Sequence, residues 1–154
     1  MNVDVQVASD AAGLPTDEEI RDRVTRAVRA VDPAADVEVS VRIVDEPEMR
    51  NLNRDYRGKD KATNVLAFPA GDAAFVPPGE RPLLGDIVVC ASVVAREAGE
   101  QGKPLDHQWC HMLVHGTLHL LGYDHIGEEQ ADKMEALERR ILKGFGIADP
   151  YAGN

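Results

Sequence analysis

Apolar and polar residues alternate in two early segments of the chain, and a period of two is typical of a strand with one buried face. The first segment, 3–7, is short and predicts an edge strand, and the second, 37–43, shows the clearest alternation. Segments 64–68 and 83–90 are rich in apolar residues and predict two further strands. Between these last two strands, residues 70–82 contain several glycines and prolines and predict a loop.

Elsewhere the apolar residues recur at the helical period of 3.6. Thr16 or Asp17 is expected to cap the first helix, Pro47 suits the first turn of the second, and Ser92 is expected to cap the third. The predicted helices cover 17–31, 47–56, 92 to Gly99 or Gly102, 104–122 and 128–143. Strands come early and helices late, which predicts an α+β fold. We expect one domain over residues 1–154, with a mixed sheet of about four strands packed against about five helices.

The composition of the chain indicates where in the cell the protein works and whether its cysteines form a disulfide. No apolar run is long enough to span a membrane, and the N-terminus lacks the pattern of a signal peptide. We therefore expect a cytoplasmic protein without a membrane partner. Cys90 and Cys110 stand in apolar surroundings without a metal-binding spacing, so we interpret both as buried thiols and not as a disulfide.

The net charge of −10 argues against a general nucleic-acid binder, because phosphates would be repelled. One stretch is an exception. It collects basic residues within twelve positions: Arg50, Arg54, Arg57, Lys59 and Lys61. The stretch could line a groove for a phosphate backbone, or it could be an ordinary solvated helix face.

All five histidines of the chain fall between positions 107 and 125. His115 and His119 are one helical turn apart and project from one face, while Gly122 ends the helix so that His125 can return to them. The helix is apolar on its other faces, so it is predicted to be buried, and buried imidazoles need partners. Three converging imidazoles suit a zinc-type metal with one open position. The alternative is a set of core histidines bonded to backbone groups.

The spacing H-x-x-x-H-x-x-G-x-x-H also matches the metzincin zinc proteases. Those enzymes need Glu after the first histidine as the general base, whereas this chain has Gly116. The ligand pattern is kept and the protease's base is missing. A metallopeptidase stays an alternative only if another residue supplies that base.

Three segments together identify a family. Residues 115–125, HGTLHLLGYDH, resemble the signature of the YbeY family of bacterial endoribonucleases and rRNA maturation factors. Residues 52–69, LNRDYRGKDKATNVLAFP, and residues 84–87, LGDI, resemble two further conserved blocks of that family. The blocks occur in the expected order. The resemblance implies a mixed sheet with packed helices and a metzincin-like metal-site helix.

The resemblance also implies a function. His115, His119 and His125 would bind one metal ion, usually zinc, and Arg57 would match the family's functional arginine. The substrate would be single-stranded RNA, with action at the 3′ end of 16S rRNA and in ribosome quality control. The ribosome and small-subunit ribosomal proteins are the expected partners, and DNA is not expected.

The residues permit this chemistry. A metal held by neutral histidines keeps its charge and can activate water or polarise a phosphate oxygen, and Arg57 can grip a phosphate with two hydrogen bonds. A third reading is a non-enzymatic ribosome-assembly factor with a structural metal. The roles of three residues stay open. His111 could be a packing residue, a partner of a ligand or a proton carrier. Asp86 could orient a ligand histidine or be a structural residue, and Asp124 is expected to cap the turn in preference to a catalytic role.

Overall fold

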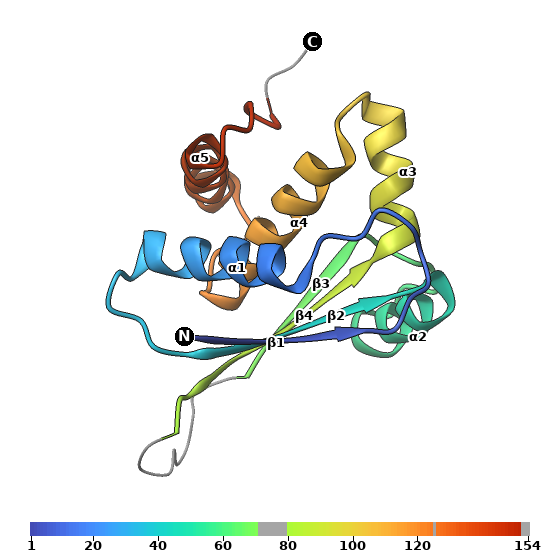
Figure 1. Ribbon diagram of the computed structural model, residues 1–154, viewed down its shortest axis with the longest axis horizontal. Coiled ribbons are helices and arrows are strands. Elements are labelled where there is room, and N and C mark those ends of the chain that lie inside the picture. The colour runs from blue at the N-terminus through green and yellow to red at the C-terminus, as the bar shows by residue number, and fades with distance from the viewer. Residues whose placement is uncertain (71–79, 125, 152–154) are drawn as a thin grey trace.

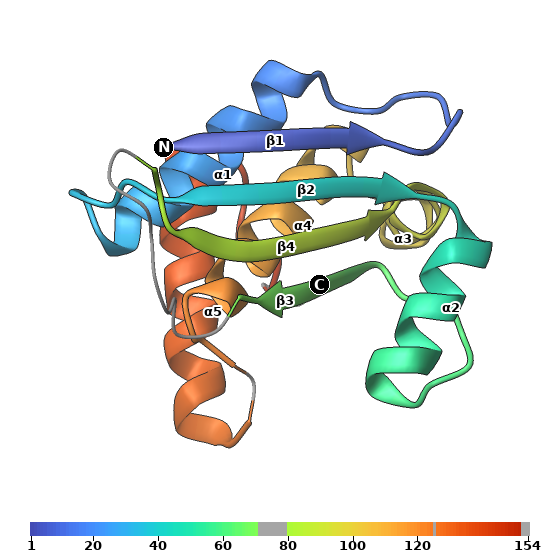
Figure 2. The same cartoon turned by 90° about the horizontal axis from the view of Figure 1, so that it is seen from below.

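A four-stranded mixed sheet forms the centre of the computed structural model, which describes residues 1–70, 80–124 and 126–151. Its spatial order is β1 (Asn2–Val7), β2 (Glu38–Val44), β4 (Leu83–Cys90) and β3 (Val65–Pro69). The first three strands are parallel, and β3 runs antiparallel to β4 at the edge (Figure 2). The predicted edge position of the first strand is therefore confirmed.

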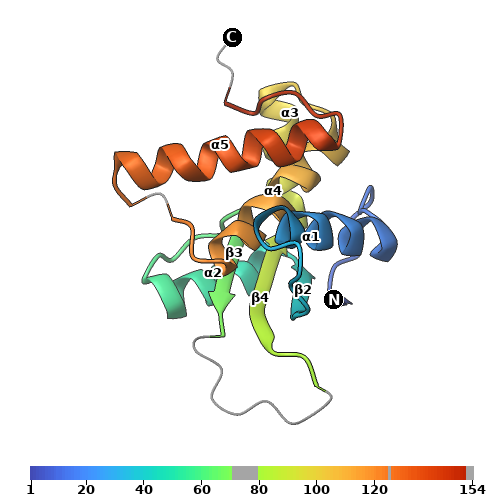
Figure 3. The same cartoon turned by 90° about the vertical axis from the view of Figure 1, so that its left-hand side faces the viewer.

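The helices divide unequally between the two faces of the sheet (Figure 1). Their bounds are α1 Asp17–Val31, α2 Glu46–Arg57, α3 Ala91–Gln101, α4 Leu105–Leu120 and α5 Glu128–Gly144. Helices α1 and α4 pack on one face, and α5 lies across the outer side of α4 (Figure 3). Helix α2 packs on the opposite face. Within the described residues, the prediction of an α+β fold with four strands and five helices is confirmed.

The alternation of side chains along the strands divides the apolar side chains of the sheet between two core clusters, one on each face. Odd-numbered side chains such as Val41, Ile43 and Ile87 are fully buried with α1 and α4. Even-numbered side chains such as Val44 and Val88 lie in a smaller cluster under α2. Helix α4 is buried on most of its surface, as the sequence predicts, because it is enclosed by the sheet, α1, α3 and α5.

Local signals place the helix starts with mixed accuracy. Thr16 caps α1 as expected, and its hydroxyl and the Glu19 side chain form a reciprocal capping box. Ser92 is not a cap, because α3 begins at Ala91 directly after β4. Helix α4 ends at Leu120, two residues before Gly122. Most of the predicted 70–82 loop lies outside the described residues.

The structure bears on two expectations, the state of the cysteines and the lack of a membrane-spanning helix. Cys90 and Cys110 are both buried free thiols, as predicted. Among the residues that the structure describes, no helix is both long and apolar enough to cross a bilayer.

Candidate metal centre

Helix α4 carries four histidines at intervals of four residues, and the rings of the last three, His111, His115 and His119, approach one another. His115 and His119 have ring centroids 4.6 Å apart, and their Nε2 atoms are separated by 3.1 Å. His111 stands one turn earlier, with its ring centroid 6.2 Å from that of His115. All three side chains are partly buried. The structure thus brings together two of the three predicted ligands, while His125 lies outside the described residues.

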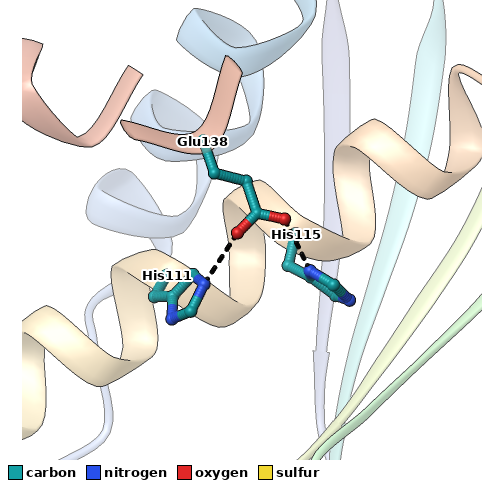
Figure 4. Close-up of side chains that lie close together, drawn as sticks. All are labelled: His111, His115 and Glu138. Carbon is teal, nitrogen blue, oxygen red and sulfur yellow. Dashed lines mark hydrogen bonds and ion pairs between the residues drawn. The ribbon is translucent and has the colours of Figure 1, made fainter. Parts of the chain in front are cut away.

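A buried carboxylate, Glu138 of α5, contacts two of these histidines (Figure 4). Its side chain is 0% exposed, and it lies 2.8 Å from Nε2 of His111 and 2.8 Å from Nδ1 of His115. The hydroxyl of Tyr151 donates a further hydrogen bond to it. His111 is therefore a partner of this carboxylate and not merely a packing residue.

The electrostatics of this cluster keep Glu138 ionised. Burial raises the pKa of the carboxyl group, but hydrogen bonds from His111, His115 and Tyr151, with the charge of His115, outweigh burial and lower the pKa to about 2. Burial and the neighbouring Glu138 raise the pKa of Tyr151, so its hydroxyl keeps its proton. An ionised carboxylate only accepts hydrogen bonds, so the protons of these three contacts belong to the histidines and the tyrosine.

Among the residues that the structure describes, two sets of atoms in this region could hold a metal ion. The first is the pair of Nε2 atoms of His115 and His119. Two nitrogens at about 2.0–2.1 Å from a tetrahedral zinc ion would lie about 3.3 Å apart, close to the observed 3.1 Å. The second set is His111, His115 and Glu138, whose ligand atoms lie within 4.8 Å of one another. In the second set, ring N–H groups already satisfy the carboxylate, so the first set is the better fit.

The first pair opens on a cleft of about 410 Å³ between α4, the edge strand β3 and the end of α2. The cleft is lined by Arg57, Thr63, Asn64, Val65, Leu66, Ala67, His115, Gly116, His119 and Asp124. Arg57 and the two histidines, which the sequence predicts as site residues, therefore border one space. The volume falls within the usual range of ligand sites.

Local backbone geometry sets the position of Arg57. It is the last residue of α2, and Gly58 follows in the left-handed conformation with φ 69°. The buried Asn53 fastens the turn, because its side-chain amide donates to the Lys61 backbone carbonyl at 2.8 Å and its backbone carbonyl accepts from the Lys59 backbone N–H at 3.3 Å. This closure of the helix end directs the chain from α2 into β3, beside the histidines.

The basic stretch divides into paired and unpaired cations. Arg50 forms two hydrogen bonds to Asp60, at 2.8 and 2.9 Å, and Arg54 contacts Asp55 at 3.2 Å. Among the described residues Arg57 makes no ion pair or hydrogen bond. Arg50 and Arg54 are therefore largely neutralised by neighbours, and Arg57 is the arginine of this stretch that is available to an anion in the cleft.

Close packing explains the glycine that follows His115. A Cβ added to Gly116 would lie 2.9 Å from Cγ2 of Ile87 and 3.2 Å from Cγ2 of Val65. Helix α4 meets the sheet at this point, so a Glu side chain could stand here only if the side chains of Ile87 and Val65, or the helix itself, shifted. The position that carries the general base in metzincins is thus occupied by a helix–sheet contact.

The two acidic positions that the sequence left open fall into different places. Asp86 is exposed on the sheet face on which α2 packs, while its neighbour Ile87 faces α4, so Asp86 does not orient His115 or His119. Asp124 borders the cleft. Tyr123, next to Asp124, packs in the cluster between α4 and α5.

Sequence reasoning missed Glu138 and Tyr151. A signal for Glu138 was present, because it stands four residues after Met134 and four before Leu142, both fully buried on the inner face of α5. A charged residue within an apolar stripe indicates a buried partner. No local pattern marks Tyr151, which reaches the cluster only through the path of the C-terminal segment.

Three comparisons agree with this architecture. A family model described as Endoribonuclease YbeY matches residues 6–146. The Endoribonuclease YbeY of Cellvibrio japonicus (strain Ueda107) is 53% identical over 150 residues, which cover 97% of this chain and 82% of that protein. The solution structure of TM1509 from Thermotoga maritima shares the fold, with a TM-score of 0.54, 24% identity, and coverage of 97% of this chain and 99% of that one.

The match to the family model spans most of the chain. The curated relative is 53% identical over 97% of this chain. The histidine helix, the segment after α2 and the start of β4 all fall within the matched region. The chain therefore belongs to the YbeY family of endoribonucleases.

Proposed function

We propose that this protein is a metal-dependent endoribonuclease that cuts single-stranded RNA and acts in maturation of the 3′ end of 16S rRNA. One observation carries the proposal: Arg57, which has no ion-pair partner among the described residues, and two converging imidazoles border the same cleft. Phosphodiester cleavage needs positive charge beside the phosphate oxygens and an activated nucleophile. The arginine would supply the first requirement, and a metal ion held by the imidazoles would supply the second.

The proposed ligands are His115, His119 and His125, and the proposed ion is zinc. Imidazole nitrogens suit zinc among the common cellular divalent ions, and three such ligands leave a position for substrate. A divalent ion held there would supply Lewis-acid chemistry to a phosphate oxygen. The role of His125 rests on the family motif, since it lies outside the described residues.

Arg57 is proposed to bind the scissile phosphate. Its planar guanidinium matches two phosphate oxygens, and no carboxylate among the described residues competes for it. Lys59 and Lys61, both exposed close by, extend the positive charge along the path of a bound strand. The net charge of −10 would repel phosphates elsewhere, so the strand is drawn to this stretch.

The scarcity of aromatic residues bears on how the cut site is selected and therefore on the partners. Only 5% of the residues are aromatic, so stacking platforms that would choose particular bases are scarce. Binding would rest on the backbone of the strand, and the cut site would be selected by the context of the rRNA. We therefore propose the ribosome and small-subunit ribosomal proteins as partners, in the cytoplasm.

Two alternatives are weaker. A metallopeptidase lacks the base that Gly116 replaces, and the contact of Gly116 with Ile87 leaves no room for one there. A structural metal in a non-enzymatic assembly factor would be enclosed by protein ligands, whereas His115 and His119 border an open cleft.

The test compares two arginines of one helix, Arg57→Ala and Arg54→Ala, by cleavage of a single-stranded RNA under single-turnover conditions. We expect Arg57→Ala to lose about 100- to 1,000-fold in rate, by analogy with other transition-state anion donors. Arg54→Ala should cleave at nearly the wild-type rate, because Asp55 already pairs Arg54. Both variants should retain the metal content of the wild type.

His119→Ala gives the background rate from any contaminating nuclease. Cleavage by Arg57→Ala at the wild-type rate would contradict the phosphate role of this residue. Cleavage by His119→Ala at the wild-type rate would contradict the proposed nuclease centre as a whole.

A further inference from the structure

The carboxylate of Glu138 is a costly group to bury, and its surroundings show what it is bound to. Withdrawing an ion from water is unfavourable unless partners compensate it. The neighbours of Glu138 on the inner face of α5 are apolar, with Met134 and Leu142 both 0% exposed. An apolar side chain would fill the site on packing grounds alone. The partners that replace water are His111, His115 and Tyr151.

The two oxygens of Glu138 have separate partners. Oε1 accepts from Nδ1 of His115 at 2.8 Å, while Oε2 accepts from Nε2 of His111 at 2.8 Å and from the Tyr151 hydroxyl. Because Oε2 is held by two donors, the carboxylate cannot rotate away from His115 without losing both. Among the described residues Nδ1 of His111 has no hydrogen-bond partner, so the ring has no competing bond that would turn it elsewhere.

The contact with Oε1 has a direct consequence for the cleft. When Nδ1 of His115 donates its proton to Glu138, the neutral ring carries its lone pair on Nε2. That Nε2 atom lies 3.1 Å from Nε2 of His119 and borders the cleft. The opposite tautomer would aim an N–H group at the place where a metal ion would be bound.

The C-terminal segment holds the third donor in place. Arg139 of α5 forms an ion pair with Asp149 at 2.9 Å, and its guanidinium lies 5.5 Å from the centre of the Tyr151 ring. The ring of Tyr151 also meets the ring of His111 edge to face, with centroids 5.6 Å apart. The ion pair of Asp149 thus fastens to α5 the segment whose Tyr151 contacts the buried carboxylate.

We propose that Glu138 is a positioning residue that fixes the tautomer and orientation of His115 for metal binding, with Tyr151 and His111 holding the carboxylate. The inference rests on the proposed metal site. Carboxylates that accept the second N–H of a metal-bound histidine typically change metal affinity 10- to 100-fold when removed. The C-terminal segment is then part of the support of the metal site, although Tyr151 does not line the cleft.

The test uses zinc affinity, measured by competition with a chromogenic chelator, and nitrogen-15 NMR of the histidine rings in the metal-free protein. Glu138→Gln should weaken zinc binding about 10- to 100-fold, and Tyr151→Phe should weaken it by a smaller factor. In Glu138→Gln the His115 signals should move away from the Nδ1–H tautomer of the wild type. Glu129→Gln, on the exposed side of α5, should leave both readouts unchanged.

Wild-type zinc affinity and an unchanged His115 tautomer in Glu138→Gln would overturn the positioning role while leaving the nuclease proposal intact. If Glu138→Gln does not fold, the zinc affinity of Tyr151→Phe tests the support of the carboxylate instead. Wild-type zinc affinity in Tyr151→Phe would overturn the role of the C-terminal segment. Unchanged zinc affinity in His119→Ala would mean that the ion lies between His111, His115 and Glu138, and that result overturns the proposal. Absence of zinc binding by the wild type would instead contradict the metal centre itself.

Discussion

Helices α2 and α4 bring the proposed site residues to the same cleft, but they hold them by different means. On α4 the histidines are partly buried, and a fully buried carboxylate fixes His115. On α2 the arginines are exposed, and Arg57 is positioned only by the way the helix ends at Gly58. The first arrangement suits a metal ion, which requires its ligands within tenths of an ångström. The second suits a phosphate, which a long cationic side chain can meet from several positions.

The same contrast applies to packing. Helix α4 touches β3, β4, α1, α3 and α5, so a change beneath it has nowhere to relax. The end of α2 faces open space, and a Cβ at Gly58 would meet nothing within 4 Å. We therefore expect substitutions under α4 to cost stability and substitutions at the end of α2 to affect mainly the chemistry of the cleft.

The largest expected difference compares two glycines with positive φ. Gly85 lies under α4 with φ 154°, and an added Cβ would be 2.4 Å from the Phe68 carbonyl oxygen and 2.7 Å from Cδ2 of Leu120. Gly85→Ala should lower the free energy of unfolding by about 3–5 kcal/mol through strain and overpacking. Gly58→Ala should cost only about 1–2 kcal/mol, because backbone conformation alone opposes it. Urea denaturation measures both, and equal losses would contradict the contrast.

A smaller effect concerns the thiol on the buried side of α4. Burial raises the pKa of Cys110 to about 11, whereas an ordinary thiol ionises near 8.5. Because the folded-state pKa lies above the unfolded value, the thiolate is suppressed in the folded protein at pH 8. Alkylation of Cys110 by iodoacetamide at pH 8 should be at least about 100-fold slower than in urea. Mass spectrometry of the modified peptide follows the reaction, and comparable rates in both conditions would mean that this side of α4 opens readily.

The fold was largely predictable because each element carries its own periodicity. Alternation in 37–43 and the apolar face of 17–31 are local properties, and the structure places β2 and α1 within a residue of the predicted bounds. The error at Ser92 has a physical reason. The parallel strand β4 runs into α3 without a connecting loop, so backbone geometry and not a side-chain cap starts that helix.

The site was predictable only where its parts are close in sequence. His115 and His119 are one turn apart, and any helix through them brings their rings together. The orienting carboxylate was expected as one possibility at Asp86, but β4 turns that side chain to the face covered by α2. Glu138 serves the histidines from another helix. Such a partnership depends on how α5 crosses α4, which no local pattern encodes.

The most direct test of the metal centre is a zinc-edge anomalous diffraction map from crystals of the zinc-loaded protein. The account predicts one strong peak per chain in the cleft, about 2.0–2.1 Å from Nε2 of both His115 and His119, with a third imidazole from His125. A peak between His111 and Glu138, or a peak enclosed by a fourth protein ligand, would contradict it.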